Sequence, residues 1–413
     1  MRSGADLSAS QDGAGPEPVR AISVLPLAAV TFVSLLGFGI FIPVFPYYGR
    51  ALDAHDGAVT LTMAAYSLGQ FISAPFWGQL SDRYGRKPIL IAGTCAATLA
   101  YFFVANAQSI EMLFAARLFG GLMAGNIAAA FAAASDISTP ASRAKTMGML
   151  GAAFGLGFIV GPAVGGLMAG PHPTLASLSH VAYASAAMNA LAALATLFIF
   201  RETLKSHDRA TTSRAPRLSV LKGRPRLQTL TVASLMMTVA FGMMESCMGL
   251  LAADRFHWSP QDLGMLFLVV GVLSVGMQGG AIGKLSARFG EGHLLIGGLI
   301  VMTLGLAGVG LAQTSLHAYL AAAFLAVGSA VTNPTLTTLS SFEASENERG
   351  GVLGVVQSAA SLGRVIGPAM AGTLYAVLGQ AAPFLIGAAL STLCALMVMR
   401  ALGGVGATRE HKI

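Results

Sequence analysis

Twelve apolar stretches, each long enough to cross a lipid bilayer, most constrain how this chain can fold. A bilayer-spanning helix needs about 20 residues. Lipid offers the backbone no hydrogen-bond partner, so we predict that every stretch is a helix. Six stretches precede a polar, basic segment and six follow it. The predicted ranges are 22–46, 58–80, 88–106, 110–134, 145–170, 178–200, 228–252, 261–284, 292–312, 316–340, 350–378 and 382–402.

The composition supports a membrane protein and excludes several other classes. Hydrophobic residues make up 54% of the chain and charged residues 10%, whereas soluble domains carry about 25% charged residues. The net charge of +7 alone would suit a nucleic-acid-binding protein, but the basic residues are spread over alternate connections. We therefore expect no nucleic-acid partner. Cys95, Cys247 and Cys394 lie far apart within predicted spans, so we expect no disulfide and no metal site.

The two halves of the chain repeat one another. A glycine pattern is followed by a similar one 206 residues later, in which Arg364 replaces Phe158. The first copy reads Gly148-x8-Gly157-x3-Gly161-Pro162-x2-Gly165-Gly166, and the second reads Gly354-x8-Gly363-x3-Gly367-Pro368-x2-Ala371-Gly372. Internal duplication with glycine-broken apolar helices is typical of secondary transporters. No Walker A loop is present in the sequence, so we do not expect ATP hydrolysis. For a secondary transporter we also expect no enzyme activity and no cofactor.

Polar segments and basic residues predict the domains and the orientation. We expect a cytoplasmic tail (1–20), a first six-helix bundle (21–201), a basic linker (202–227), a second six-helix bundle (228–402) and a second tail (403–413). The connections opposite the linker contribute only Arg50 and Arg255 among lysines and arginines. The positive-inside rule therefore places both termini and the linker in the cytoplasm, in a multi-pass protein of the inner (plasma) membrane.

Three motifs stand out in the first half of the chain. The first follows the second span and reads Gly78-Gln-Leu-Ser-Asp82-Arg83-Tyr-Gly85-Arg86-Lys87. The second is Arg117-x3-Gly121-x3-Gly125 in the fourth span, and the third is the glycine–proline pattern of the fifth span. These motifs resemble those of the major facilitator superfamily, and in particular its twelve-span drug:proton antiporters, such as tetracycline and multidrug exporters. The resemblance covers nearly the whole chain. It implies an all-α fold of twelve transmembrane helices in two pseudo-symmetric bundles.

The resemblance also implies a cytoplasmic gate at the first motif. Asp82 would lock the two halves on the inside, and we expect its partner at the start of the eleventh span, near Arg349. A carboxylate is favoured there because the unpaired N–H groups of a helix N-terminus attract an anion. The second half has Ala287 in place of this acid, which indicates one main latch. The gate residues are Gly78, Asp82, Arg83, Gly85, Arg86 and Arg349.

The glycine–proline pattern of the fifth span resembles a motif associated with antiporters, and we call it the antiporter motif. It has a packing role beside its implied role in switching. Gly157, Gly161 and Gly165 are spaced to form one small-residue stripe, which allows another helix to approach closely. A bulky residue at Gly157 or Gly161 is expected to impair switching more than insertion. Ordinary tight packing is the alternative. The predicted motif residues are Gly148, Gly157, Gly161, Pro162, Gly165 and Gly166.

Two charged residues within the spans are predicted to couple transport to protons. Glu245 is the only acid well inside a predicted span, because Glu111 and Asp136 lie at helix ends. Such an acid can load and release a proton as a cavity opens to either side. The alternative is a structural acid paired with Arg117 or Arg255. The resemblance implies a part in proton coupling for Arg117, and the alternative is that its side chain reaches the outer interface.

Further polar or flexible side chains within spans are candidates to line a substrate cavity. Each of them is also suited to an ordinary packing or hydrogen-bonding role between helices. Arg364 has three open roles, namely pairing with a carboxylate, contact with an anionic head group, or reach toward the cytoplasm. The candidates are Gln70, Asn126, Met244, Gln278, Asn333, Gln357 and Arg364.

These observations predict a proton-coupled transporter that exports small hydrophobic or amphiphilic compounds, such as antibiotics, by alternating access. The expected partners are a small-molecule substrate, protons and membrane lipids, and the expected state is a monomer. A lipid or lysolipid flippase on the same scaffold is the alternative. A sugar or organic-acid symporter fits less well, because the fifth span resembles that of antiporters.

Overall fold

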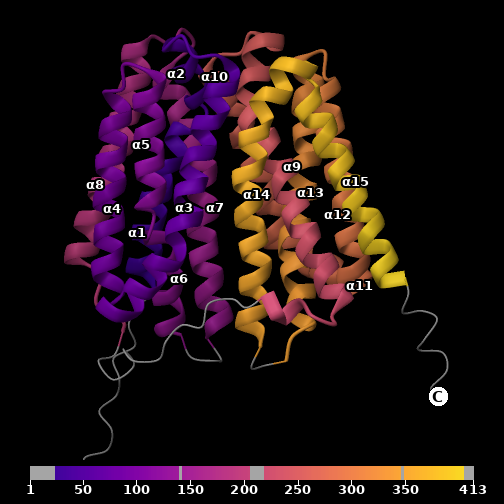
Figure 1. The fold of residues 1–413 in the computed structure, drawn as a ribbon. Coiled ribbons are helices and arrows are strands. Elements are labelled where there is room, and N and C mark those ends of the chain that lie inside the picture. The colour runs from indigo at the N-terminus through magenta and orange to yellow at the C-terminus, as the bar shows by residue number, and fades with distance from the viewer. Residues whose placement is uncertain (1–23, 139–141, 205–217, 346–347, 404–413) are drawn as a thin grey trace, which may run out of the picture.

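The regular structure of the described residues is entirely helical (Figure 1). The computed structural model describes residues 24–138, 142–204, 218–345 and 348–403. The first half contains α1 (Leu25–Phe41), α2 (Phe45–Ala51), α3 (Asp56–Tyr84), α4 (Arg86–Ala105), α5 (Ile110–Leu122), α6 (Asn126–Asp136), α7 (Arg143–Ala169) and α8 (Leu175–Phe198). The second half contains a 3-10 turn, η1 (Leu218–Leu221), then α9 (Pro225–Phe256), α10 (Pro260–Gly276), a π-helical turn, η2 (Met277–Ala281), α11 (Ile282–Phe289), α12 (Glu291–Leu311), α13 (Ser315–Phe342), α14 (Arg349–Leu378) and α15 (Ala382–Gly403).

Three of the predicted spans are interrupted. The helix pair α1 and α2 bends by 44°, α5 and α6 are separated by residues 123–125, and α10 continues through η2 into α11. When these pieces are joined, the described residues form twelve long segments, and the prediction of an all-α, twelve-segment fold is confirmed. Ten are apolar enough to cross a membrane by composition, or eleven with the bent pair. The remaining segment, α3, has 29 residues and tolerates polar side chains because it faces the other bundle.

Consecutive helices gather into two bundles that lie side by side (Figure 1). In the first, α1 packs against α7 and α8, and α4 packs against α8. In the second, α9 packs against α14 and α15, and α12 packs against α13 and α15. The bundles are joined mainly by α3 with α14 and by α7 with α10, and also by smaller contacts of α9 with α2 and α3.

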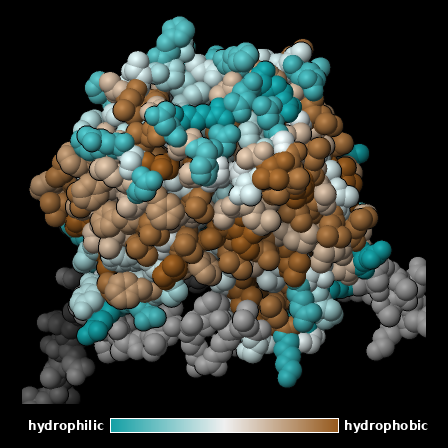
Figure 2. Space-filling view, turned by 45° about the horizontal axis from the view of Figure 1, so that its top comes forward, coloured by the Kyte–Doolittle hydropathy of each residue, from teal (hydrophilic) through white to brown (hydrophobic). Residues whose placement is uncertain are grey.

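The outer surface is apolar around the middle of the molecule. Large hydrophobic side chains such as Phe76, Phe102 and Phe324 are about half exposed. Figure 2 shows hydrophobic residues below a cap of hydrophilic residues, on the face in view. Exposed apolar surface on this scale suits lipid rather than water. The chain is therefore a multi-pass membrane protein.

The bundles touch at one end and separate at the other. We call the end where α8 ends and α9 begins the linker end, and the opposite end, at the top of Figure 1, the closed end. At the closed end, a Cβ on Gly166 would lie 2.5 Å from the carbonyl oxygen of Pro260 in α10, and one on Gly372 would lie 2.7 Å from that of Asp56. Toward the linker end, a Cβ on Gly148 or Gly350 would meet nothing within 4 Å.

Candidate functional site

A large cavity lies between the two bundles. Its volume is about 1290 Å³, and it is lined by side chains from both halves of the chain. The lining runs from Phe45 and Gly242 to Phe131 and Ser358, which lie nearer the linker end. Because the bundles are in contact at the closed end and apart at the linker end, the cavity faces the linker end.

Among the described residues that line this cavity, three carry a formal charge. They come from three helices, Arg117 from α5, Glu245 from α9 and Arg364 from α14. The rest of the lining is largely aromatic and aliphatic, with scattered amides and hydroxyls. Charged groups within a membrane are costly unless they face water or a partner. An aqueous cavity between the bundles provides the water.

Glu245 lies in the wall contributed by α9. Its neighbours Met243 and Met244 are buried, whereas Glu245 itself is partly exposed because it borders the cavity. None of the ion pairs or hydrogen bonds of the described residues includes its carboxylate. Among charged side chains, Arg364 and then Arg117 exert the largest electrostatic effects on it. This arrangement leaves the carboxylate available to a proton or a ligand.

The structural alternative for Glu245, pairing with Arg117 or Arg255, is not observed among the described residues in this conformation. Arg255 instead caps the neighbouring helix, because its Nη1 donates to the carbonyl oxygens of Gly310, at 2.7 Å, and Ala312, at 3.0 Å. Arg117 does not lie within ion-pair distance of the Glu245 carboxylate.

Aromatic rings surround Arg117. Its guanidinium carbon lies 4.6 Å from the centre of the Tyr66 ring, 5.3 Å from that of Phe45 and 5.9 Å from that of Phe38. The rings attract the cation through their negative faces. Its Nε atom is buried without a hydrogen-bond partner. The side chain therefore lies in the cavity wall and does not reach the outer interface. We call these three rings and Arg117 the aromatic collar.

Arg364 lies near the middle of α14 and borders the cavity. Its Nη2 donates to Ser361 Oγ at 2.8 Å, one turn earlier on the same helix. None of the ion pairs among described residues includes it. Three roles were open to Arg364, and one of them, pairing with a carboxylate, is not observed in this conformation.

The remaining cavity candidates divide into two groups. Gln70, Asn126, Asn333 and Gln357 border the cavity. Met244 and Gln278 do not belong to the described lining, which corrects their placement. Met244 packs into the hydrophobic core of the second bundle, and Gln278 lies in η2.

A chain of hydrogen bonds between polar side chains holds Asn126 in place. Of its members, only Asn126 was predicted from the sequence. Its Nδ2 donates to Ser34 Oγ at 3.1 Å, and Ser34 donates to Asn189 Oδ1 at 3.1 Å. The chain joins α6, α1 and α8, so Asn126 has a structural role as well as a place in the cavity wall.

A cluster of ionic and polar groups closes the far side of the cavity. Arg50 in α2 lies 2.8 Å from Asp56 in α3 and 2.6 Å from Asp254 in α9. The Tyr375 hydroxyl in α14 donates to the same Asp254 carboxylate at 2.7 Å. We call these four residues the closed-end latch. It joins the two bundles, because Arg50 and Asp56 belong to the first and Asp254 and Tyr375 to the second.

One residue of the closed-end latch, Asp254, lies on the same helix as Glu245, nearer the closed end. At about 1.5 Å of rise per residue, Asp254 and Glu245 are separated by about 14 Å along α9. The sequence interpretation missed the latch and treated Arg50 only as a topology signal. A signal was present, because Asp56 and Asp254 flank predicted spans that end on the same side as Arg50.

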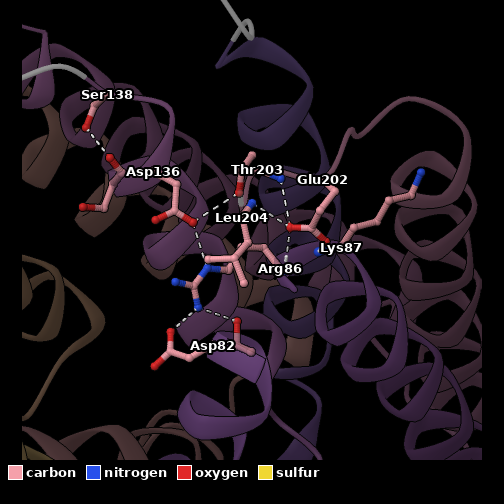
Figure 3. Close-up of polar contacts among 10 residues, drawn as sticks. Asp82, Arg86, Lys87, Asp136, Ser138, Glu202, Thr203 and Leu204 are labelled. Carbon is pink, nitrogen blue, oxygen red and sulfur yellow. Dashed lines mark hydrogen bonds and ion pairs between the residues drawn. The ribbon is translucent and has the colours of Figure 1, made fainter. Parts of the chain in front are cut away.

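At the linker end, Arg86 is the centre of a second charged network (Figure 3). Its Nη1 lies 2.6 Å from Asp82 Oδ1, and its Nε lies 2.8 Å from Asp136 Oδ2. Thr203 Oγ1 also donates to Asp136, at 3.3 Å. Asp82 therefore binds within its own bundle in this conformation. The predicted contact with Arg349, whose side chain lies outside the described part of the chain, remains a prediction.

Glu202 caps the first turn of α4 in the same network (Figure 3). It accepts N–H bonds at 2.9–3.0 Å from Arg86, Lys87, Thr203 and Leu204. Burial alone would raise the pKa of its carboxyl group, but these backbone donors together hold the pKa below its ordinary value. The sequence interpretation missed Glu202, and placed Asp136 only at a helix end.

The other predicted gate residues have distinct positions. Gly85 adopts φ +108° between α3 and α4, a conformation that favours glycine. A Cβ on Gly78 would meet nothing within 4 Å. Arg83 is exposed, and its guanidinium lies 5.4 Å from the centre of the Tyr84 ring.

The glycine stripe of α7 packs within the first bundle. A Cβ on Gly157 would lie 2.8 Å from Leu35, and one on Gly161 would lie 2.7 Å from Gly39, both in α1. Gly165 faces Ile40. Because these glycines contact their own bundle, bulky residues there would disturb its packing. We therefore move the expected effect on switching to Gly166, which faces the second bundle.

Comparison with known proteins identifies the family. The family model of the Major Facilitator Superfamily matches residues 27–344 and, in a second match, residues 256–412. The chain belongs to the major facilitator superfamily.

Two proteins named for drug resistance resemble this chain over most of its length. The class C tetracycline resistance protein of Escherichia coli is 29% identical over 383 residues, which cover 90% of this chain and 94% of that protein. Multidrug resistance protein 2 of Bacillus subtilis is 28% identical and covers 83% of this chain and 86% of its own length.

Two solved transporter structures share the fold of this chain. The nucleoside transporter NupG matches with a TM-score of 0.76 at 15% identity, over 92% of this chain and 98% of that one. The human organic anion transporter MFSD10 matches with a TM-score of 0.68 at 22% identity, over 93% of this chain and 100% of that one.

Proposed function

We propose that this chain exports small hydrophobic or amphiphilic compounds in exchange for protons, by alternating access. One observation carries the proposal: Glu245, the one carboxylate in the described lining, borders a cavity that faces one end of the molecule and is sealed at the other. The names of the relatives, which include tetracycline, multidrug and quinolone resistance proteins, support drug export. The orientation that fits the basic linker places the linker end in the cytoplasm.

In this scheme, the described conformation receives substrate from the cytoplasm. The substrate binds while Glu245 is ionised and favours the change that separates the closed end. Glu245 then faces the outside, takes up a proton there, and so weakens its hold on the substrate. The protonated carrier returns and releases the proton inside. Because substrate and proton exclude each other at one carboxylate, the proton gradient drives export.

The test is proton-driven transport in proteoliposomes. Glu245→Gln retains the shape of the side chain but cannot lose a proton. We expect it to abolish accumulation of tetracycline or a quinolone under an imposed pH gradient, while exchange of labelled for unlabelled compound continues without a gradient. Glu111→Gln, an exposed acid at the start of α5, is the matched control and should behave like the wild type. Gradient-driven accumulation that persists in Glu245→Gln contradicts the proposed proton site.

A lipid or lysolipid flippase is the second candidate, and one observation favours it. Phe71 and Ile72 of α3 border the cavity, yet 38% and 59% of their surfaces are exposed. At these two residues, the wall of the cavity is also part of the outer surface of α3, where a lipid could enter. Movement of a fluorescent lysolipid between leaflets, without transport of any drug, would favour the flippase.

A further inference from the structure

Two fixed positive charges share the cavity with one acid. Arg117 and Arg364 stay charged at any physiological pH, whereas Glu245 can gain a proton. The described lining therefore carries a net charge of about +1 when Glu245 is ionised and about +2 when it is protonated, since three of its residues are charged. The cavity is positive in either state.

Ligands with a single charge fit this cavity poorly. A cation would pair with Glu245 but leave Arg364 without a counter-charge. An anion would pair with Arg364, yet it would bind better after Glu245 takes up a proton, because the ionised carboxylate repels it. The anion and the proton would then travel together, which is the opposite of exchange. A ligand that carries both charges allows proton exchange at Glu245 and also supplies a counter-charge to Arg364.

The geometry leaves room for two separate contacts. Glu245 and Arg364 lie on the packed pair α9 and α14 of the second bundle. Each acts electrostatically on the other, yet their charged groups are too far apart for an ion pair. The Arg364 guanidinium has one hydrogen bond, to Ser361, so donors remain for a bidentate carboxylate.

The wall from the first bundle suits an aromatic body. Arg117 is already compensated by the rings of the aromatic collar, and Phe158 lies 5.8 Å from Phe38, with both rings bordering the cavity. Aromatic faces and edges bind flat apolar groups. On the opposite wall, Phe241 and Met237 of α9 border the same space.

We propose that the substrates are amphoteric, with a basic amine that binds Glu245, an acidic group that binds Arg364, and an aromatic body that packs against the aromatic collar. This inference rests on the proposed function, because it uses Glu245 as the site of exchange. The amine competes with the proton, which preserves exchange, while the acidic group stays with Arg364 throughout. Arg364 thereby determines specificity without taking part in proton transfer.

The test uses one fluorescent scaffold in four charge states. Nα-dansyl-lysine carries both charges, its methyl ester only the amine, its Nε-acetyl derivative only the acid, and the Nε-acetyl methyl ester neither. Their binding to the purified full chain is measured by dansyl fluorescence at pH 7. We expect the compound with both charges to bind about tenfold to hundredfold more tightly than either singly charged one, as for hydrogen bonds to charged groups.

Substitutions separate the two contacts. In Arg364→Gln, Nα-dansyl-lysine and its methyl ester should bind with affinities within about twofold of each other. The preference for a free amine over an acetylated one should remain. In Glu245→Gln, the preference for the amine should be lost and that for the acid retained. Arg288→Gln, at an exposed arginine of α11 outside the described cavity lining, is the matched control and should preserve both preferences.

Three outcomes would overturn the inference. The methyl ester could bind wild type as well as the amino acid does, Arg364→Gln could weaken all four compounds equally, or none of the four could bind. If the ester alone is exchanged for protons in proteoliposomes, and this exchange depends on Glu245, the proposed function stands and the amphoteric substrate does not. Loss of the dependence on Glu245 would instead refute the proposed function.

Discussion

Glu202 supplies a carboxylate where α4 needs acceptors. The first N–H groups of a helix have no partner within it, and this side chain binds two of them across the chain from the end of α8. A favourable helix-dipole interaction adds to these bonds. One residue therefore joins the end of the sixth segment, α8, to the start of the third segment, α4, beside the loop that carries the family motif.

We predict that Glu202→Gln destabilises the protein in a pH-dependent way. The pKa of the native carboxyl lies below its ordinary value of 4.5, so the ionised form stabilises the fold above that pH, and the contribution is lost as the pH falls through the lower native value. The expected cost is about 1–2 kcal/mol at pH 7. Thermal unfolding in detergent at pH 7 and pH 4 measures it.

The neighbouring exposed residue provides the control for this measurement. Arg201→Ala, next to Glu202 but exposed, should leave the melting temperature unchanged. The difference in melting temperature between wild type and Glu202→Gln should be smaller at pH 4 than at pH 7. An equal gap at both pH values would show that the charge of Glu202 is not what stabilises α4.

At the scale of the helices, length and polarity are the features that sequence predicts best. Lipid imposes a minimum length and an apolar composition, so the predicted ranges 58–80 and 292–312 agree within a few residues with α3 and α12. The breaks near residues 42–44 and 123–125 were harder to predict, because they lie within continuous apolar stretches. The sequence left Met244 with two roles, lining the cavity or packing in the core, because it does not say which face of α9 meets the core.

The closed-end latch and the Arg86 network depend on contacts between distant segments. Arg50 and Asp254 lie 204 positions apart in the chain, and Arg86 and Asp136 lie 50 apart. Each residue alone resembles an ordinary helix-end charge. Glu245 was recognisable because an acid within an apolar span is costly, whereas surface charges give no such signal.

We predict that Gly166→Leu impairs transport more than insertion. The new side chain would collide with the Pro260 carbonyl of α10, where α7 and α10 join the bundles. The closed end could then not close fully, and the expected transport rate in proteoliposomes falls by about tenfold, for a penalty of about 1.4 kcal/mol.

Gly151→Leu is the matched control on the same helix. It adds the same side chain near the linker end, where a Cβ would meet nothing within 4 Å. We expect it to insert and transport like the wild type. Equal loss of transport in both variants would show that α7 tolerates no leucine, and that contact with α10 is not the cause.

At the scale of the whole molecule, the closed-end latch opposes opening of the outer side. Its groups are partly exposed, with side-chain exposures of 29% for Arg50 and 26% for Asp254, so each pair contributes modestly. We predict that Asp254→Asn favours the alternative conformation by about 1 kcal/mol, which is about a fivefold change in population.

Distances between spin labels across the closed end measure this change. Labels at His172, between α7 and α8, and at Gln313, between α12 and α13, are exposed and lie on different bundles. Asp254→Asn should increase the longer-distance population in a background without the three cysteines. Asp53→Asn, an exposed acid near the same end, should not. Identical distributions in wild type and Asp254→Asn would show that the latch does not hold the bundles together.

The account depends most on an exchange of proton for substrate at Glu245. Its most direct test is the number of protons released when the detergent-purified protein binds a transported compound, followed with a pH indicator in weakly buffered solution. We predict release by wild type and by Glu111→Gln, and none by Glu245→Gln although it still binds the compound. Release from Glu245→Gln equal to that of wild type would contradict the account.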